Sequence, residues 1–150
     1  MNLSSSKSLK NVHITYVALT VFAVLIIVFY GNTLFNGFVF EDRVIIEANE
    51  YIRSLKYLPK VVTGCLWEFA DGACDKTNYP YYRPVQTLSI MLTYQISSRP
   101  WSFHLVNLLY FFAAASLVYL FTRLLTKKLL LAFLTAILFI IHPINSGVVN

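Results

Sequence analysis

Acidic side chains are absent from long parts of this sequence. None precedes Glu41 and none follows Asp75, so the 7 Asp and Glu residues all fall between those two positions. Lys and Arg number 12, and the formal net charge is +5. The excess comes from cations beside apolar runs: Lys7, Lys10, Arg123, Lys127 and Lys128. Because the positive-inside rule explains this placement, the basic pI of about 9.3 does not indicate a nucleic-acid partner.

Charge of either sign is scarce overall, and apolar residues take its place. Charged residues make up 13% of the chain and hydrophobic residues 57%, with a mean hydropathy of +0.63. A typical soluble domain carries roughly 25% charged residues. The composition therefore predicts an all-α integral-membrane protein. A channel or transporter is disfavoured, because the charged residues lie between the apolar runs and not within them.

Cysteine is also rare. Cys65 and Cys74 are the 2 cysteines of the chain, and both lie in the segment that the charge pattern places outside the cytoplasm. No histidine accompanies them there, which argues against a zinc site. In an oxidising compartment the pair predicts a disulfide, and the alternative is two unpaired thiols.

The first apolar run predicts an uncleaved transmembrane helix over residues 12–30. At about 1.5 Å per residue it is long enough for a bilayer core of about 30 Å. A signal peptide would begin in the same way, but the run is long and no small-residue cleavage site follows it. Residues 1–11, rich in Ser and Lys, are expected to form a disordered cytoplasmic tail.

Two more transmembrane helices are expected near the end of the chain. The second covers residues 101–125, and a cytoplasmic turn at 126–128 connects it to a third helix and its outer end at 129–149. The strictly apolar part of the third helix ends before His142 and measures about 20 Å, short of a full span. The helix either continues through Pro143 with a kink or ends early.

Residues 31–100 form a long loop that we place on the extracytoplasmic side. Apolar residues at 45, 46, 52, 55 and 58 alternate with charged ones at spacings that suit one or two short amphipathic helices. These helices either lie flat on the bilayer and cover a cavity, or pack on the rest of the loop. Residues 65–80 are predicted to be irregular, and a further surface helix is expected to begin near Pro84.

Two adjacent carboxylates, Glu41 and Asp42, appear where the first apolar region ends in NGFVFEDR. Acid groups beside a membrane segment are partly desolvated, so their pKa values and metal affinity can be tuned. The pair is therefore the first candidate for catalysis, or for binding a divalent cation such as Mg²⁺ or Mn²⁺. The alternative is an acidic turn at a helix end.

Further polar candidates follow the acid pair. Arg83 precedes the helix expected at Pro84, and a guanidinium beside a helix N-terminus suits a phosphate; the alternative is a cation that extends to the membrane surface. His104 and Asn107 share a helical face, where hydrogen bonding between helices competes with a site role. His142 is expected by the mouth of any cavity.

In order along the chain, FNGFVFED, YIRSLKYLP, YYRPVQTLSIMLTY, PWSFHLVNLLYFF and LTAILFIIHPIN resemble the N-terminal region of the multi-spanning glycosyltransferases of the C-type fold (GT-C). Within them, the sequence is most similar to the transmembrane and tetratricopeptide-repeat O-mannosyltransferases and their bacterial relatives. The resemblance implies a larger protein with more membrane helices, supplied by the same or a partner chain. The sequence would then be an N-terminal fragment or a split reading frame.

The resemblance implies a polyprenyl-phosphate-linked sugar donor and an acidic motif in the active site, matched here by Glu41 and Asp42. It assigns the lipid phosphate to Arg83. The family's FHLVN segment matches His104 and Asn107. His142 matches the first His of a motif that commonly reads His-Pro-x-His-Thr-Glu, and Asn145 stands at the position of the second His. His142 and Asn145 complete the expected donor-binding set.

Two departures from the family pattern are visible. Glu41 stands where Asp is usual, and after His142 the second His and the acidic residue of the motif are missing, with Gly147 at the end of the stretch.

The sequence therefore predicts part of a membrane glycosyltransferase that transfers a mannose-like sugar to a protein or glycan acceptor outside the cytoplasm. Its partners would be membrane lipid, the lipid-linked donor and the acceptor. The short tail favours a bacterial inner membrane over the endoplasmic reticulum. The alternative is a small three-span membrane protein or degenerate fragment without catalysis, acting as a scaffold or lipid-binding partner.

Overall fold

The computed structural model describes residues 3–39, 41–71 and 81–149 and is helical, with no strand within those ranges. The chain divides into two compact units. The helix unit comprises Met1–Leu34 and His104–Asn150, and the loop unit comprises Phe35–Phe103. This agrees with the all-α class predicted from composition.

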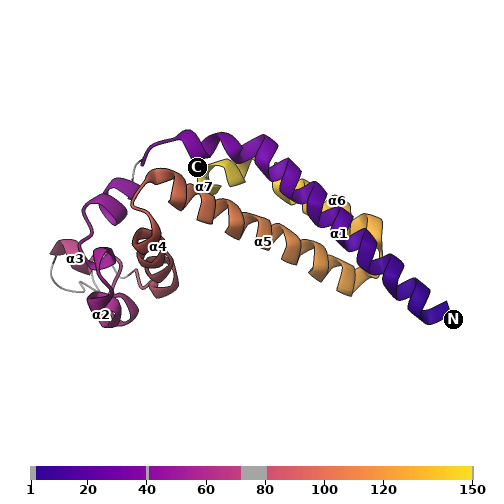
Figure 1. The fold of residues 1–150 in the computed structure, drawn as a ribbon, viewed down its shortest axis with the longest axis horizontal. Coiled ribbons are helices and arrows are strands. Elements are labelled where there is room, and N and C mark those ends of the chain that lie inside the picture. Colours follow the sequence, from indigo (N-terminus) through magenta and orange to yellow (C-terminus); the bar gives the residue numbers. More distant parts are fainter. Residues whose placement is uncertain (1–2, 40, 72–80, 150) are drawn as a thin grey trace. The chain divides into compact units, whose positions relative to one another are not determined.

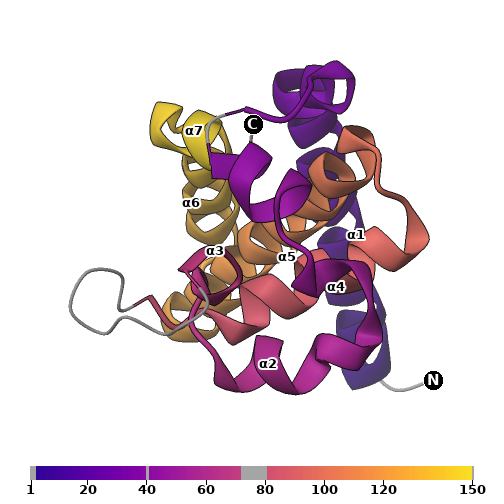
Figure 2. The same ribbon diagram turned by 90° about the vertical axis from the view of Figure 1, so that its left-hand side faces the viewer.

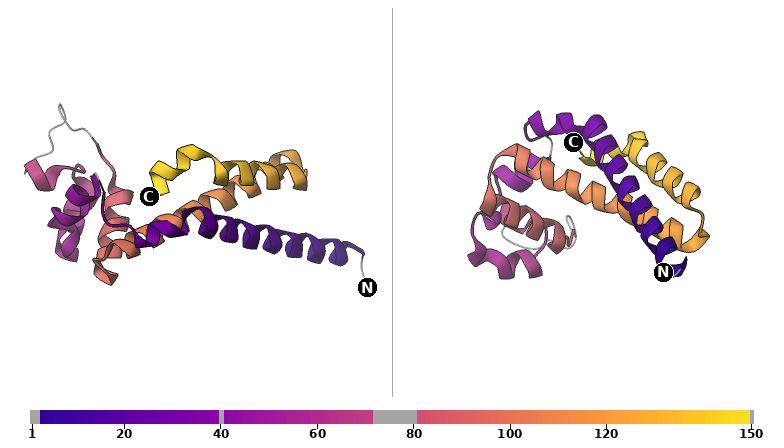
Figure 3. Two further views of the ribbon diagram at one scale, coloured as in Figure 1. Left: turned by 90° about the horizontal axis from the view of Figure 1, so that it is seen from above. Right: turned by 45° about the vertical axis from the view of Figure 1, so that its right-hand side comes forward.

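Three long helices, α1, α5 and α6, form the helix unit and lie side by side (Figure 1, Figure 3). Helix α1 spans Leu3–Tyr30 and is followed by the 3-10 turn η1 (Gly31–Phe35), while α5 spans Pro100–Thr126 and α6 spans Leu129–Ile141. Two helical stretches, Val12–Phe35 and Pro100–Thr126, are long and apolar enough to cross a membrane. They correspond to the first two predicted spans, whereas α6 is shorter and its span stays a prediction.

Small residues and aromatic rings form the core of the helix unit. Ala115, Ala132 and Ala136 are fully buried, which allows helix backbones to approach closely. The ring of Phe22 in α1 meets Tyr119 edge-on at 5.6 Å and stacks on Phe133 at 5.7 Å, with distances measured between ring centroids. These contacts join all three helices.

Helix α1 begins earlier than expected. Its first residue is Leu3, so the helix includes most of the segment predicted to be a disordered tail. The physical reason is cooperativity: once the apolar run from Val12 is helical, each further residue adds a hydrogen bond without a new nucleation step. Leu, Ser and Lys in this segment permit that extension.

Helix α6 ends at Ile141, which is the early end that the sequence allowed as one of two outcomes. Pro143 has no N–H group and cannot donate to the carbonyl of Phe139, its partner in a continuing helix. That carbonyl instead accepts from the Asn145 side-chain amide at 2.6 Å. The chain then continues as η5 (Pro143–Asn145) and the short helix α7 (Ser146–Val149).

The loop unit consists of short helical segments around an apolar core. In chain order they are the π-helical turn η2 (Arg43–Glu47), the 3-10 turns η3 (Tyr51–Arg53) and η4 (Leu55–Tyr57), and the helices α2 (Leu58–Thr63), α3 (Glu68–Asp71) and α4 (Pro84–Ile96). Helix α4 packs beside α2 (Figure 2). The buried residues are Ile45, Ile46, Ile52, Val61, Leu66, Met91 and Phe103.

The predicted helix at Pro84 is confirmed as α4. Residues 43–57 form separate turns where one or two amphipathic helices were expected, because polar side chains interrupt them. The side-chain oxygen Oδ1 of Asn49 accepts from the Tyr51 N–H at 2.9 Å, and Ser54 is extended with φ of −145°. Asn and Ser in this role compete with helical hydrogen bonds. Helix α3 is a turn of helix in the segment expected to be irregular, whose residues 72–80 lie outside the described structure.

Candidate functional site

The acid pair, Glu41 and Asp42, directly precedes η2, the first helical segment that lies wholly in the loop unit. The Asp42 N–H donates to the Val39 carbonyl at 3.0 Å, just before η2. The Glu41 side chain is exposed and that of Asp42 is half-buried. Asp42 does not cap η2 with its side chain. A carboxylate in this position is accessible to a substrate while its backbone is held by a hydrogen bond.

Arg83 stands at the N-terminus of α4 with its backbone anchored and its side chain exposed. The preceding residues are held by two bonds, from the Leu66 N–H to the Tyr81 carbonyl at 2.9 Å and from the Tyr82 hydroxyl to the Val62 carbonyl at 2.7 Å. The Arg83 guanidinium lies over the Tyr81 ring, 5.3 Å from its centroid. This cation–π contact orients a guanidinium that has donors for an oxyanion.

His104, in α5, is buried, with 2% of its surface exposed. Neither of its ring nitrogens has a hydrogen-bond partner among the described residues. Leaving a buried imidazole without hydrogen-bond partners costs about 1–3 kcal/mol of folding free energy. We therefore expect that a group outside the described residues bonds to the His104 ring. Asn107, on the same face by spacing, is exposed.

His142 and Asn145 are part of the turn that ends α6. The Nδ1 atom of His142 accepts from the Ile144 N–H at 3.3 Å, which leaves Nε2 as the protonated nitrogen of the neutral ring. The His142 side chain is exposed. Asn145 is half-buried, and its side-chain amide donates to the Phe139 carbonyl at the C-terminal end of α6. This predicted substrate-binding residue therefore also stabilises the end of a helix.

The predicted metal and disulfide sites stay predictions. Among residues 3–39, 41–71 and 81–149, no group of three or more His, Cys, Asp or Glu side chains is placed to hold a metal ion. Glu41 and Asp42 alone would supply carboxylate oxygens to a divalent cation. Cys65 is half-buried before Leu66, and its predicted partner Cys74 lies outside the described residues.

The predicted site residues are divided between the two units. Glu41, Asp42 and Arg83 belong to the loop unit, and His104, His142 and Asn145 belong to the helix unit. The gathering of Glu41, Asp42, Arg83, His104 and His142 around one cavity stays a prediction.

The sequence reasoning overlooked a paired lysine in the loop unit. The Lys60 ammonium donates to the Tyr51 hydroxyl at 3.2 Å and lies 4.8 Å from the centroid of the same ring. This hydrogen bond raises the pKa of Lys60 above its ordinary value. Lys60 in α2 and Tyr51 in η3 belong to different segments, so no helical spacing in the sequence predicts that they meet. Only the fold could reveal this contact.

These features define a class: a helical protein with two stretches able to cross a membrane and a loop unit that presents an acid pair and an oriented arginine. Comparison with known proteins narrows the class. The chain is 33% identical over 127 residues to the protein O-mannosyl-transferase Tmtc2 of Drosophila melanogaster, which covers 83% of the chain. It is 31% identical over 126 residues to Tmtc1 of the same fly and 28% identical over 142 residues to TMTC3 of Mus musculus, covering 83% and 94% of the chain.

The chain is therefore a relative of the TMTC protein O-mannosyl-transferases, which confirms the resemblance found in its motifs. It spans 13% to 15% of the length of these curated relatives. No family model and no solved structure matches the chain.

Proposed function

We propose that this chain is part of an integral-membrane GT-C glycosyltransferase that moves a mannose-like sugar from a polyprenyl-phosphate donor to a protein or glycan acceptor. The observation that carries the proposal is its similarity, over 83% to 94% of the chain, to proteins named protein O-mannosyl-transferases. Further membrane helices, from the same or a partner chain, would complete the catalytic cavity. The loop unit would face the extracytoplasmic side.

Asp42 is the proposed catalytic base. As the acceptor hydroxyl attacks the anomeric carbon, Asp42 accepts its proton; the bond from that carbon to the phosphate oxygen breaks, and the lipid phosphate leaves with the electron pair. Attack opposite the leaving group inverts the anomeric centre. A positioned base contributes roughly 10²–10⁴-fold to such a rate. Support comes from the partial exposure of Asp42 and its backbone bond to Val39.

Glu41 would act beside Asp42, either by orienting the acceptor or by sharing a divalent cation. It is one methylene longer than the Asp usual in the family, so its carboxylate reaches farther from the backbone. The Glu41→Asp variant restores the family pattern. We expect transfer activity equal to or above that of the unchanged protein.

Arg83 would bind the phosphate of the donor and stabilise the charge that develops as the phosphate leaves. A guanidinium pairs with two phosphate oxygens at once, which fixes the orientation of the leaving group. The stacking of Arg83 on Tyr81 supports this role, because it limits the positions that the guanidinium can occupy.

His104, His142 and Asn145 are proposed donor-binding residues. The unpartnered nitrogens of buried His104 are consistent with a polar partner supplied by the donor or by further helices. His142 would donate from Nε2, given that Nδ1 accepts from Ile144.

The experiment replaces Asp42 with Asn in the protein that carries this chain and measures transfer of radiolabelled mannose from polyprenyl-phosphate mannose in isolated membranes. Loss of the base should lower the rate by at least about 100-fold. Glu47→Gln is the matched control, because Glu47 is an exposed acid a few residues away and is expected to leave transfer unchanged.

Membrane insertion is measured in parallel by alkaline extraction, and both variants should stay in the membrane fraction. Undiminished transfer by the Asp42→Asn variant would refute the catalytic role. Absence of transfer by the unchanged protein, with correct insertion, would favour the non-catalytic scaffold.

A further inference from the structure

At the end of α5, two cations adjoin a hollow in the helix unit. Leu120, Arg123, Leu124 and Lys127 line this hollow, whose volume is about 560 Å³. Arg123 belongs to the last turn of α5, and Lys127 directly follows that helix. The hollow is therefore lined by two apolar side chains and two cations.

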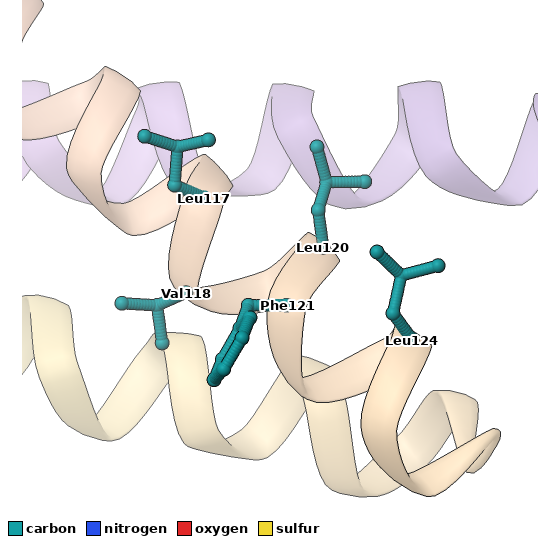
Figure 4. Close-up of a pocket in the computed structure, with 5 residues that line it drawn as sticks. All are labelled: Leu117, Val118, Leu120, Phe121 and Leu124. Carbon is teal, nitrogen blue, oxygen red and sulfur yellow. The ribbon is translucent and has the colours of Figure 1, made fainter.

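A second groove, lined by apolar side chains of α5 (Figure 4), shares Leu120 and Leu124 with this hollow. It measures about 540 Å³ and is lined by Leu117, Val118, Leu120, Phe121 and Leu124. In Figure 4, Leu117, Leu120 and Leu124 point to one side of α5, and Val118 and Phe121 point to the other. Because Leu120 and Leu124 line both hollows, one elongated ligand could occupy the groove with its apolar part and the basic hollow with its polar part.

The packing of the helices positions Arg123. Its Nη1 atom donates to the Thr15 hydroxyl of α1 at 2.5 Å, and the residue is half-buried. A guanidinium has five N–H donors, so the bond to Thr15 leaves others for an anion. This contact holds the cation against the helix bundle instead of letting it extend freely into solvent.

Lys127 has an unusual backbone conformation. Its φ is 57°, the one positive φ of a non-glycine residue in the described ranges. Its N–H donates to the Arg123 carbonyl at 2.9 Å and ends α5, a position where glycine is the common residue. A lysine there costs about 1 kcal/mol relative to glycine. A cation thus occupies a position where the backbone alone would favour glycine.

The helix unit has no carboxylate side chain to neutralise these cations. Residues 1–34 and 104–150 contain no Asp or Glu, but they contain Lys7, Lys10, Arg123, Lys127 and Lys128. The carbonyls at the end of α5 carry partial negative charge and favour nearby cations by roughly 0.3–1 kcal/mol at a surface. This attraction to the helix end would act on the two cations without a hollow and without the contact of Arg123 with Thr15, so it does not explain these two features. A full counter-charge has to come from outside the unit.

We propose that the Arg123–Lys127 hollow and the adjoining groove bind an anionic phospholipid. Its phosphate lies between the guanidinium and the ammonium, and an acyl chain follows the groove from Leu124 to Leu117. Basic pockets beside membrane helices recognise anionic headgroups in this way. The continuous apolar groove selects a phospholipid over free phosphate. The site is separate from the residues assigned to sugar transfer.

The test uses the full chain in detergent and native mass spectrometry, with equimolar phosphatidylglycerol and phosphatidylcholine that carry identical acyl chains. We expect preferential retention of phosphatidylglycerol. Each cation near an anionic surface contributes about fivefold, so Arg123→Gln and Lys127→Gly should each weaken retention of that lipid about fivefold. Lys127→Gly also removes the backbone strain, so its loss of lipid cannot come from unfolding.

Two controls make the result decisive. Lys128→Gln removes a neighbouring exposed charge that does not line the hollow, and it should weaken retention less than Lys127→Gly does. Inorganic phosphate, matched in ionic strength to chloride, should not displace the lipid. Equal retention of both lipids, equal effects of the Lys127 and Lys128 variants, or displacement by inorganic phosphate would each overturn the proposal.

Discussion

The helix unit and the loop unit bury their apolar residues in different ways. In the helix unit, alanines and aromatic rings form the core, buried Tyr119 and His104 have polar atoms without partners among the described residues, and large apolar side chains such as Leu124 and Val28 are more than 70% exposed. In the loop unit, aliphatic side chains form the core and charged side chains such as Arg53 lie outside. Exposed apolar side chains occur in the loop unit too, for example Val85 and Ile96. The contrast therefore lies in the charges: the helix unit contains no Asp or Glu, as expected of a unit surrounded by lipid, and the loop unit has a charged surface, as expected of one that faces water.

The largest expected difference comes from matched truncations of fully buried isoleucines. Ile52→Ala in the loop unit should destabilise that unit by about 3–4 kcal/mol, because both the transfer from water and the cavity contribute. From the proposed membrane location we expect Ile140→Ala in the helix unit to cost only about 1–2 kcal/mol, because lipid is as apolar as the core and only packing is lost.

Denaturant unfolding in detergent, followed by protease cleavage within each unit, measures both values. Equal costs would contradict the proposed membrane location of the helix unit.

The close approach of helices in the helix unit can be tested by enlarging a small residue. Ala136 is fully buried in α6, so Ala136→Leu should destabilise the unit by about 1–3 kcal/mol through overpacking. Ala113→Leu in α5 is the control, because Ala113 is exposed and a larger apolar side chain there meets lipid. Thermal unfolding in micelles compares the two variants. A stable Ala136→Leu protein would mean that the alanine contacts do not position the helices.

Two tyrosine hydroxyls make the same bond in the two units. Tyr30 donates to the buried Ile140 carbonyl at 2.7 Å, and Tyr82 donates to the exposed Val62 carbonyl at the same distance. Tyr30→Phe should cost about 1 kcal/mol, because Ile140 loses its partner away from water. Tyr82→Phe should cost about 0.5 kcal/mol or less, because water replaces the hydroxyl. Unfolding measurements on both variants decide whether burial sets the difference.

The smallest effect concerns the Lys60–Tyr51 contact of the loop unit. Its hydrogen bond raises the folded pKa of Lys60 above the unfolded value. The contact therefore contributes its full stabilisation of the loop unit at pH values below the unfolded pKa of Lys60, about 10.4. This contribution is lost as the pH rises through the folded pKa. Tyr51→Phe should lower the pKa of Lys60, which NMR titration of its side-chain carbon resonances can follow. An unchanged pKa would show that the hydroxyl does not set it.

Much of the helix unit follows from its sequence pattern, because apolar runs of sufficient length have few other stable structures. The spans over 12–30 and 101–125 were predicted for that reason and are close to α1 and α5. In the loop unit, the helix at Pro84 was predicted from a proline at a first helical position followed by an apolar periodicity, and it is observed as α4. The turns at 43–57 were harder to predict, because side-chain bonds from Asn49 and Ser54 decide them and these bonds leave no periodic signal.

For the candidate site, too, the sequence identified residue types, and only the fold showed the contacts of those residues. Residue types and motif order identified Asp42, Arg83 and His104 as polar groups in unusual places, and the similarity to protein O-mannosyl-transferases agrees with the motifs. Spacing could not show that His104 is buried without a partner, because burial depends on what packs around a side chain. Spacing also could not show that the Asn145 side chain donates to the Phe139 carbonyl, which the N–H of residue 143 would bond in a continuing helix if that residue were not proline.

The sequence by itself determined that the protein is helical and apolar, where its carboxylates lie, and which family it resembles. These are properties of composition and local order, which act before the chain folds. Only the tertiary structure decided that Arg123 reaches Thr15 on α1 and that Tyr30 bonds to Ile140, 110 positions away in the chain. Such contacts depend on how helices pack, and many sequences with the same hydropathy would pack differently.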